Sequence, residues 1–402
     1  MDTGVERPRE LPIKEFGRAT DTRDTLARAK KQREKYNLDD YFVVDVDAHH
    51  FETQSWSEVV DRIPDPVIKD IASNFKANGR LTPGILGGSG MPSHQNVGGR
   101  IPHDPGLEEP HTNDEGLPRD VVLVRRALDS MGIDKQVSFP TPMLGLGMHP
   151  ELDVEVAISH AYNRWFTECV LPHDDRIIGL GYLPFGDPEA CIKTVEQFGD
   201  KKGIKGFTIT SVRYKPVHHN SYMRLYRMLE ERGLPLAFHA GPFWGASDGF
   251  VRQLNRFLSV HAISFSLCNM VHLANWVMNG LPEKFPKLKV IWIESGVAWM
   301  AFMTQRFDNE YLMRSSEAPA LKRLPSEYMR EMYYTSQPIE RTDMKLLEAT
   351  MNAIDAKNSM LYASDWPHWD FDLPSTILDL PFLDDQSKRN ILGLNAKKVF
   401  DL

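Results

Sequence analysis

The chain has 402 residues, of which 42% are hydrophobic and 25% charged, and this is ordinary globular composition. A formal net charge of −8 with no visible basic cluster argues against a nucleic-acid-binding surface. No apolar run approaches the roughly 18 residues that a membrane span requires, so no membrane partner is expected. The three cysteines are scattered and form no CxxC pair, and the N-terminus lacks an apolar signal core. We therefore expect a cytoplasmic protein.

The first 40 residues form a polar segment that we separate from the body of the chain. Residues 22–35 look helical and are rich in Arg, Lys and Ala, but no core-facing pattern is clear. Two interpretations stay open, namely an arm that packs on the body or on a neighbouring subunit, and a disordered tail.

Residues 41–402 are predicted to form one domain, interrupted by an insertion at about 57–118. A helix-like stretch at 56–76 is broken by Pro64 and Pro66, and the part that follows, 81–117, is rich in Gly, Pro, Asn and His. Loops of this length in a compact domain are usually functional or disordered. The insertion is a candidate lid, although its histidines are more simply read as solvated loop side chains.

Strands and helices alternate along the rest of the chain. The expected strands are 41–44, 136–139, 177–183, 206–210, 236–239, 290–294, 333–336 and 360–363. The expected helices between and after them are 120–131, 151–170, 187–198, 221–232, 255–279, 297–314, 343–356 and 384–400. Such alternation implies parallel pairing with right-handed crossovers. Eight units predict a (β/α)8 TIM barrel, with an N-terminal arm and a long insertion after strand 1.

Acidic and imidazole side chains follow the first expected strand, at the rim where barrel chemistry takes place. Because side chains alternate along an extended chain, Asp45, Asp47 and His49 should share one side, and His50 should point away. Asp and His on one face form half of a metal site that needs ligands from elsewhere.

Other strand ends carry the missing ligands. His239 closes the fifth strand, Glu294 the sixth, and Asp365 follows the eighth. Asp47, His49, His239 and Asp365 together form a set of two imidazoles and two carboxylates, which suits Mn, Fe or Zn. Such an ion lowers the pKa of a bound water or polarises a substrate oxygen. We therefore predict a divalent transition metal at this rim.

Glu294 and His368 are the candidate catalytic residues. Glu294 is predicted to act as general acid/base or as a further ligand, the alternative being a structural pair with an arginine. Glu52 and His368, with Glu294, could complete a position for a second ion.

Four residues are candidates for substrate binding at the predicted rim. Arg213 follows the fourth strand and could hold a substrate carboxylate in a bidentate manner. His149 comes shortly after the second strand, and Trp244 and Trp366 would give the mouth an aromatic lining. The expected substrate is a small molecule.

These motifs, in this order, resemble those of the amidohydrolase-related proteins. The resemblance rests on Asp-x-Asp-x-His at 45–49, the strand-five His239, Phe-Pro-Lys-Leu-Lys-Val at 285–290 and Ser-Asp-Trp-Pro-His at 364–368. The branch it points to is that of aminocarboxymuconate-semialdehyde decarboxylase and the dihydroxybenzoate decarboxylases. It implies a metal-dependent hydrolase or decarboxylase acting on a small carboxylate or aromatic acid, with His239 and Asp365 as ligands.

The sequence departs from that family at two positions. Asp47-x-His49 stands where the family usually has His-x-His or Glu-x-His, and this more anionic site favours Mn or Fe over Zn. Glu294 stands where the decarboxylases carry a catalytic His. Some relatives with extra carboxylates are similar to dinuclear non-haem iron oxygenases, one of which pairs two related chains. An Fe or Fe/Mn oxygenase and a non-catalytic partner subunit therefore remain alternatives, and a homo-oligomer or a hetero-oligomer with a related chain is expected.

Overall fold

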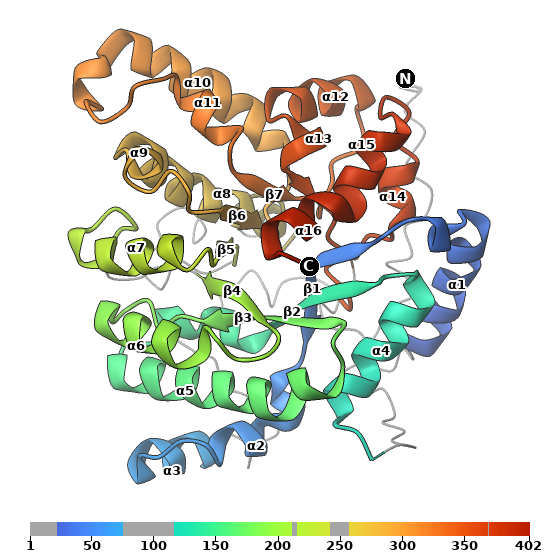
Figure 1. The fold of residues 1–402 in the computed structure, drawn as a ribbon, viewed down its shortest axis with the longest axis vertical. Coiled ribbons are helices and arrows are strands. Elements are labelled where there is room, and N and C mark those ends of the chain that lie inside the picture. The colour runs from blue at the N-terminus through green and yellow to red at the C-terminus, as the bar shows by residue number, and fades with distance from the viewer. Residues whose placement is uncertain (1–21, 75–115, 211–214, 242–256, 369) are drawn as a thin grey trace.

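The computed structural model describes residues 22–74, 116–210, 215–241, 257–368 and 370–402. Its centre is an eight-stranded sheet in which the strands follow one another in sequence order and every pairing is parallel. Helices surround this sheet, as Figure 1 shows. The predicted (β/α)8 TIM barrel is thereby confirmed.

The eight strands are β1 (Val44–His50), β2 (Lys135–Pro140), β3 (Ile177–Tyr182), β4 (Ile204–Ile209), β5 (Leu236–His239), β6 (Val290–Ile293), β7 (Tyr333–Thr335) and β8 (Met360–Leu361). The longer helices are α1 (Thr22–Lys35), α3 (Pro66–Asn74), α4 (Arg119–Met131), α5 (Leu152–Trp165), α6 (Pro188–Phe198), α7 (Met223–Glu231), α8 (Phe257–Met278), α10 (Ala298–Arg314) and α12 (Met344–Ala353). Shorter ones are α2 (Trp56–Val60), α9 (Leu281–Lys284), α11 (Pro325–Met329), α13 (Ala356–Ser359), α14 (Ser375–Leu378), α15 (Asp385–Arg389) and α16 (Asn395–Phe400).

The first strand differs from the prediction. It begins at Val44 and runs through the polar residues to His50, and all seven of its residues are buried. The apolar run at 41–44 is therefore the approach to the strand, and the acidic and imidazole groups lie within it.

Local signals explain where several helices begin and end. Asp187 caps α6 by accepting hydrogen bonds from the backbone N–H groups of Glu189 and Ala190, and Pro188 occupies the first helical position. Gly132 ends α4 in the left-handed conformation at a φ of 72°. These boundaries place each helix to return the chain to the start of the next strand.

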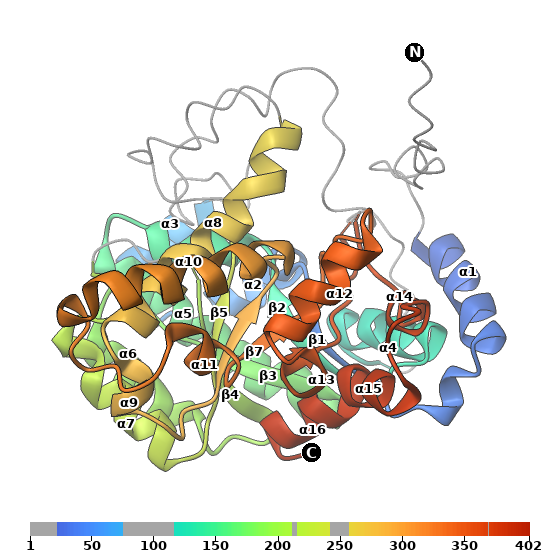
Figure 2. The same ribbon diagram turned by 90° about the horizontal axis from the view of Figure 1, so that it is seen from above.

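Apolar side chains from the strands fill the barrel, and the C-terminal helix packs with them. Val44, Val46, Phe139 and Ile291 belong to one buried cluster that also contains Phe400 of α16. The chain end lies over β1 in Figure 1 and at the same edge as α16 in Figure 2. Because α16 packs beside the beginnings of the strands, the polar strand ends lie at the opposite, carboxyl end of the barrel.

The described part of the N-terminal segment packs on the body of the chain. Leu26 and Ala29 of α1 are buried in the main core cluster. The Ser375 hydroxyl donates to Gln32 Oε1 at 2.6 Å, and the Tyr36 hydroxyl donates to Asp379 Oδ1 at 2.9 Å. Residues 22–40 thus pack on the body of the chain, whereas residues 75–115 of the insertion, which were predicted as a candidate lid, lie outside the described residues.

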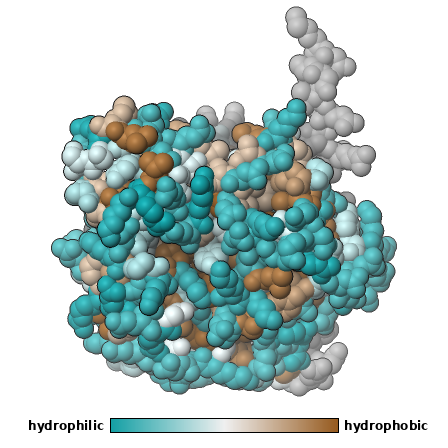
Figure 3. Space-filling model, turned by 45° about the horizontal axis from the view of Figure 1, so that its top comes forward, coloured by the Kyte–Doolittle hydropathy of each residue, from teal (hydrophilic) through white to brown (hydrophobic). Residues whose placement is uncertain are grey.

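The outer layer of the described ranges consists of helices. None of the helices there combines the length and the apolarity needed to cross a bilayer. The face drawn in Figure 3 is largely hydrophilic, with separate apolar patches. The N-terminal half of α8 extends beyond the body of the barrel, as Figure 2 shows.

Candidate metal centre

A bulge in β1 directs two candidate ligands toward the barrel axis. The pairing register with β2 shifts between Asp45 and Ala48. Val46 belongs to the barrel's apolar interior, and the next residue, Asp47, joins the ligand cluster together with His49. A bulge places one extra residue in a strand and re-aims the side chains that follow. Val44 and Val46 therefore face inward in the first part of β1, and Asp47 and His49 face inward in the second part, at the edge of the apolar core.

The structure shows the predicted side-chain orientation for His50 but not for Asp45. His50 does point away from the centre: it bonds Ser138 Oγ at 2.9 Å and stacks on Tyr162 and Phe166. Asp45, which strict alternation placed with Asp47 and His49, is not in the ligand cluster. The shift in register explains this error, because alternation holds only along a regular strand.

Two carboxylates at other strand ends have an unusual backbone. Glu294 has a φ of 54° and Asp365 a φ of 61°, both in the left-handed region that is uncommon for residues other than glycine. Such strain persists only where the surrounding structure imposes it, and it clusters at functional sites. Glu294 directly follows β6 and Asp365 lies in the segment after β8, and both point their carboxylates to the same region.

Candidate ligand atoms form two overlapping groups. Asp47, His49, His239 and Glu294 offer atoms that all lie within 4.8 Å of one another, and His49, Asp365 and His368 form a second group on the same criterion. His49 Nε2 lies 3.4 Å from Asp47 Oδ1 and 3.3 Å from Asp365 Oδ1. All four residues predicted as the primary metal ligands are thus brought together, joined by Glu294 and His368.

The two central imidazoles are oriented as metal ligands usually are. His49 Nδ1 lies 3.3 Å from the carbonyl oxygen of Pro140, and His239 Nδ1 lies 2.8 Å from that of Ala240. A proton on Nδ1 would donate to these carbonyls, which leaves Nε2 of each ring with a lone pair. Such backbone partners are typical of metal-ligating histidines. In both rings Nε2 faces Asp47, and Nδ1 of His239 also lies 3.3 Å from Glu294 Oε2.

Three carboxylate oxygens in the cluster are buried and have no hydrogen-bond partner, namely Asp47 Oδ2, Glu294 Oε2 and Asp365 Oδ2. Buried polar atoms are almost always satisfied, so unsatisfied acceptors from three different strand ends require an explanation. A divalent cation would satisfy the oxygens of Asp47 and Asp365, and the set of carboxylates and imidazoles is one that transition ions prefer. The residues therefore fit a metal.

The pKa shifts in the cluster without an ion also indicate a site suited to a cation. Burial raises the pKa of Glu294 far above its usual value, and Asp365 and Asp47 raise it further. Burial lowers the pKa of His49, but Asp365 and Asp47 outweigh this effect and raise the pKa to about 10. A protonated His49 ring between Asp47 and Asp365 thus supplies positive charge that a bound cation would otherwise supply.

Glu52 is not part of either ligand group. Its Oε2 accepts from the backbone N–H of Thr141 at 3.0 Å, and its Oε1 accepts from that of Met143 at 2.6 Å. Both oxygens are thus committed to the turn after β2, and this geometry does not support Glu52 as a ligand to a second ion.

The predicted substrate-binding residues have mixed outcomes. Arg213 and Trp244 lie outside the described residues, so their predicted role stays a prediction. His149 Nδ1 accepts from the backbone N–H of Glu151 at 3.0 Å, which is a local turn contact. Trp366 is buried, and its ring packs edge-on to Phe371 at a centroid distance of 4.8 Å.

One polar contact beside the cluster was missed from the sequence. His261 of α8 lies with its Nε2 3.4 Å from Asp370 Oδ2, which links α8 to the segment after β8. Asp370 in turn contributes to the raised pKa of Glu294. No local pattern marks His261, because it lies within an apolar helix that is brought over the site only by the tertiary fold.

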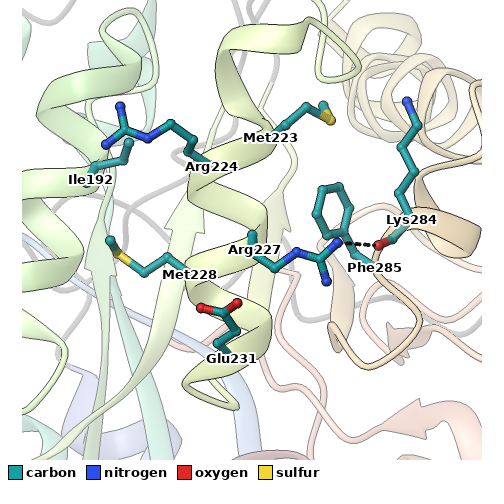
Figure 4. A pocket seen from close by; sticks show the side chains of 8 residues that line it. All are labelled: Ile192, Met223, Arg224, Arg227, Met228, Glu231, Lys284 and Phe285. Carbon is teal, nitrogen blue, oxygen red and sulfur yellow. Dashed lines mark hydrogen bonds between the residues drawn. The ribbon is translucent and has the colours of Figure 1, made fainter.

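A groove of about 570 Å³ on the outer helical layer is separate from this cluster. It lies between α6, α7 and α9, and Arg224, Arg227 and Lys284 border it (Figure 4). The two arginines are held by neighbours: Arg224 pairs with Glu189 at 2.8 Å, and Arg227 donates to the carbonyl of Lys284 at 3.0 Å. None of the candidate ligands lines this groove.

Residues 123–402 match the family model described as amidohydrolase. The chain belongs to the amidohydrolase family. The match begins after the insertion and covers β2 to β8, and therefore includes His239, Glu294 and Asp365.

Solved structures of decarboxylases share this amidohydrolase fold. A 5-carboxyvanillate decarboxylase from Sphingomonas paucimobilis is 18% identical with a TM-score of 0.65, over 90% of this chain and 99% of that one. A 2,6-dihydroxybenzoate decarboxylase from Rhizobium is 15% identical with a TM-score of 0.62, over 90% and 99%. A dihydroxybenzoic acid decarboxylase from Polaromonas sp. JS666, solved with bound manganese and 2-nitroresorcinol, is 17% identical with a TM-score of 0.59, over 90% and 97%.

We predict that Asp47→Ala and Asp365→Ala each weaken metal binding by more than about 100-fold. Loss of a residue that only hydrogen-bonds a metal ligand already lowers the metal affinity by about 10- to 100-fold. Metal content after expression in metal-replete medium and chelator competition measure this. Glu348→Gln, which changes an exposed carboxylate of α12, should bind metal as the unaltered protein does. A metal-loaded Asp365→Ala protein would refute the ligand assignment.

Metal binding should also release protons. His49 carries a proton in the metal-free protein because its pKa is raised to about 10, and a ligand imidazole must give that proton up. Affinity should therefore rise with pH between about 6 and 9. Calorimetric titration with Mn²⁺ in two buffers of different ionisation enthalpy should give different observed enthalpies. Equal enthalpies would show that no proton leaves.

Proposed function

We propose that this chain is a metal-dependent decarboxylase of a small aromatic acid. The observation that carries the proposal is the buried cluster of carboxylates and imidazoles with unsatisfied oxygens at the carboxyl end of an amidohydrolase barrel. Three fold relatives named above act as decarboxylases of hydroxylated aromatic acids, and one of them holds manganese. This supports the same reaction class here.

Asp47, His49, His239 and Asp365 would hold the ion. The equal share of oxygen and nitrogen donors favours Mn or Fe over Zn. A bound divalent ion would polarise a substrate oxygen and offset the charge of the buried carboxylates.

Glu294 is positioned to carry a proton beside the ligand set. His239 separates it from Asp47: Nε2 of the ring lies 3.2 Å from Asp47 Oδ1, whereas Nδ1 lies 3.3 Å from Glu294 Oε2. Burial raises the pKa of Glu294 well above its usual value, and the carboxylates of Asp365 and Asp47 raise it further, which favours its protonated form. When the bond between the ring carbon and the carboxylate breaks, its electron pair stays on the ring carbon and CO₂ leaves. Glu294 then donates its proton to that carbon as a general acid.

A second function is favoured by the second ligand group. Asp365 Oδ1 lies 2.6 Å from His368 Nδ1, and the rings of His49 and His368 are 4.3 Å apart. With Asp365 and His368 beside the first group, the cluster could hold two ions, as a dinuclear Fe or Fe/Mn oxygenase would require. Two redox-active ions per chain with a visible absorption band would support this function over the decarboxylase.

We predict that the metal-loaded protein releases CO₂ from at least one hydroxylated benzoic acid, with 2,6-dihydroxybenzoate and 5-carboxyvanillate as the first probes. Glu294→Gln should lower kcat by about 10²- to 10⁴-fold, the usual contribution of a general acid, and should retain the metal. Product and CO₂ release per minute and metal content are the measurements.

Glu340→Gln is the matched control. Glu340 Oε2 accepts from the backbone N–H groups of Val297 and Ala298, so this carboxylate is near the end of β6 but outside the ligand groups. Its kcat should stay within a few-fold of the unaltered value. Full activity of Glu294→Gln would remove Glu294 from the mechanism, and loss of metal from it would make Glu294 a ligand.

A further inference from the structure

The barrel closes where β1 meets β8, and the backbone pairing there is incomplete. The N–H of Val46 donates to the carbonyl of Tyr362 at 2.9 Å, and the N–H of His49 donates to that of Trp366 at 2.6 Å. Between these bonds, the N–H of Asp365 donates to the carbonyl of Asp47 at 2.6 Å. The N–H of Ser364 bonds a side chain instead.

That side chain is the carboxylate of Asp45. Its Oδ1 accepts from the N–H of Ser364 at 2.8 Å and from the N–H of Asp47 at 3.2 Å, and its Oδ2 accepts from the Ser364 hydroxyl at 2.5 Å. Asp45 is fully buried. One carboxylate therefore touches the backbone of one candidate ligand, Asp47, and the residue that directly precedes another, Asp365.

Both segments that Asp45 joins are irregular. On one side is the bulge between Asp45 and Ala48, and on the other is the left-handed Asp365 with a φ of 61°. Neither conformation is the one an isolated strand end would adopt, so each needs outside contacts to persist. The three hydrogen bonds of Asp45 supply such contacts to both at once.

We propose that Asp45 is a positioning residue that sets the spacing between Asp47 and Asp365 across the barrel closure. It does not belong to the ligand groups, and it acts through the two backbone segments that carry them. The effect on metal affinity rests on the proposed metal centre, whereas the effect on the two backbone segments does not. A carboxylate with a purely local folding role would change stability without changing the geometry of a bound ion.

Three variants separate these roles. Asp45→Ala removes all three hydrogen bonds. Asp45→Asn keeps Oδ1 as an acceptor for both N–H groups, and its amide can donate to the Ser364 hydroxyl. Asp120→Ala is the matched control, because Asp120 is a buried aspartate that accepts from the Ser55 hydroxyl at 2.6 Å at a different place in the barrel.

The first measurement uses metal-free protein. Hydrogen–deuterium exchange of peptides that cover 44–50 and 361–368 should become at least about tenfold faster in Asp45→Ala and stay near the unaltered rate in Asp45→Asn and Asp120→Ala. Unchanged exchange in Asp45→Ala would overturn the proposal, whether or not the protein binds metal.

The second measurement uses Mn²⁺ and Co²⁺ as probes. Asp45→Ala should bind Mn²⁺ about 10- to 100-fold more weakly, the usual loss when a partner behind a ligand is removed, and should shift the Co²⁺ d–d spectrum. Asp45→Asn should restore both, and Asp120→Ala should change neither. If Asp45→Ala kept the Mn²⁺ affinity and the Co²⁺ spectrum of the unaltered protein, the positioning role would be refuted and the metal centre would not. Absence of Mn²⁺ and Co²⁺ binding in the unaltered protein would refute the metal centre and with it this half of the proposal.

Discussion

The constraint on which the rest of the site depends is the burial of several ionisable groups in one small volume. Asp47, His49, His239 and Glu294 bring ligand atoms within 4.8 Å of one another, and each is almost fully buried. Carboxylates taken out of water repel each other and lose hydration, so they must neutralise or share a cation. The raised pKa of Glu294, which favours its neutral form, and the raised pKa of His49, which favours its cationic form, correspond to these two responses.

The barrel supplies the framework that makes this arrangement possible. Parallel strands converge at their carboxyl ends, so residues far apart in the sequence, such as Asp47 and Asp365, come into contact through a 2.6 Å backbone hydrogen bond. At the other end of the barrel, α16 packs against the apolar interior. Gly393, which precedes α16, lies so close to Phe42 that a Cβ on it would be 2.0 Å from the Phe42 carbonyl oxygen. Only glycine fits there.

Much of this was predictable from the sequence, because the signals were local. The alternation of strands and helices predicted the barrel, and the fifth strand was found where it was expected, at Leu236–His239. His239, Glu294 and Asp365 were recognised as polar residues at or shortly after the ends of apolar strands. Barrel geometry brings such positions to the same end of the sheet.

What could not be predicted depends on departures from regular geometry. Alternation placed Asp45 on the same side of the strand as Asp47, but a bulge lies between them, and no residue type in the sequence predicts a bulge. Glu52 was considered for a second ion because its type and position fit, yet backbone N–H groups of the turn after β2 use its oxygens. The contact of His261 with Asp370 arises only from packing of distant segments.

Anomalous diffraction at the Mn, Fe and Zn edges, from crystals of protein produced in metal-replete medium, tests most directly whether side chains from β1, β5 and the segment after β8 share a cation. We predict an anomalous peak within about 2.0–2.3 Å of ligand atoms of Asp47, His49, His239 and Asp365. A structure in which these side chains stand as described, with no anomalous peak between them, would show that they do not share an ion.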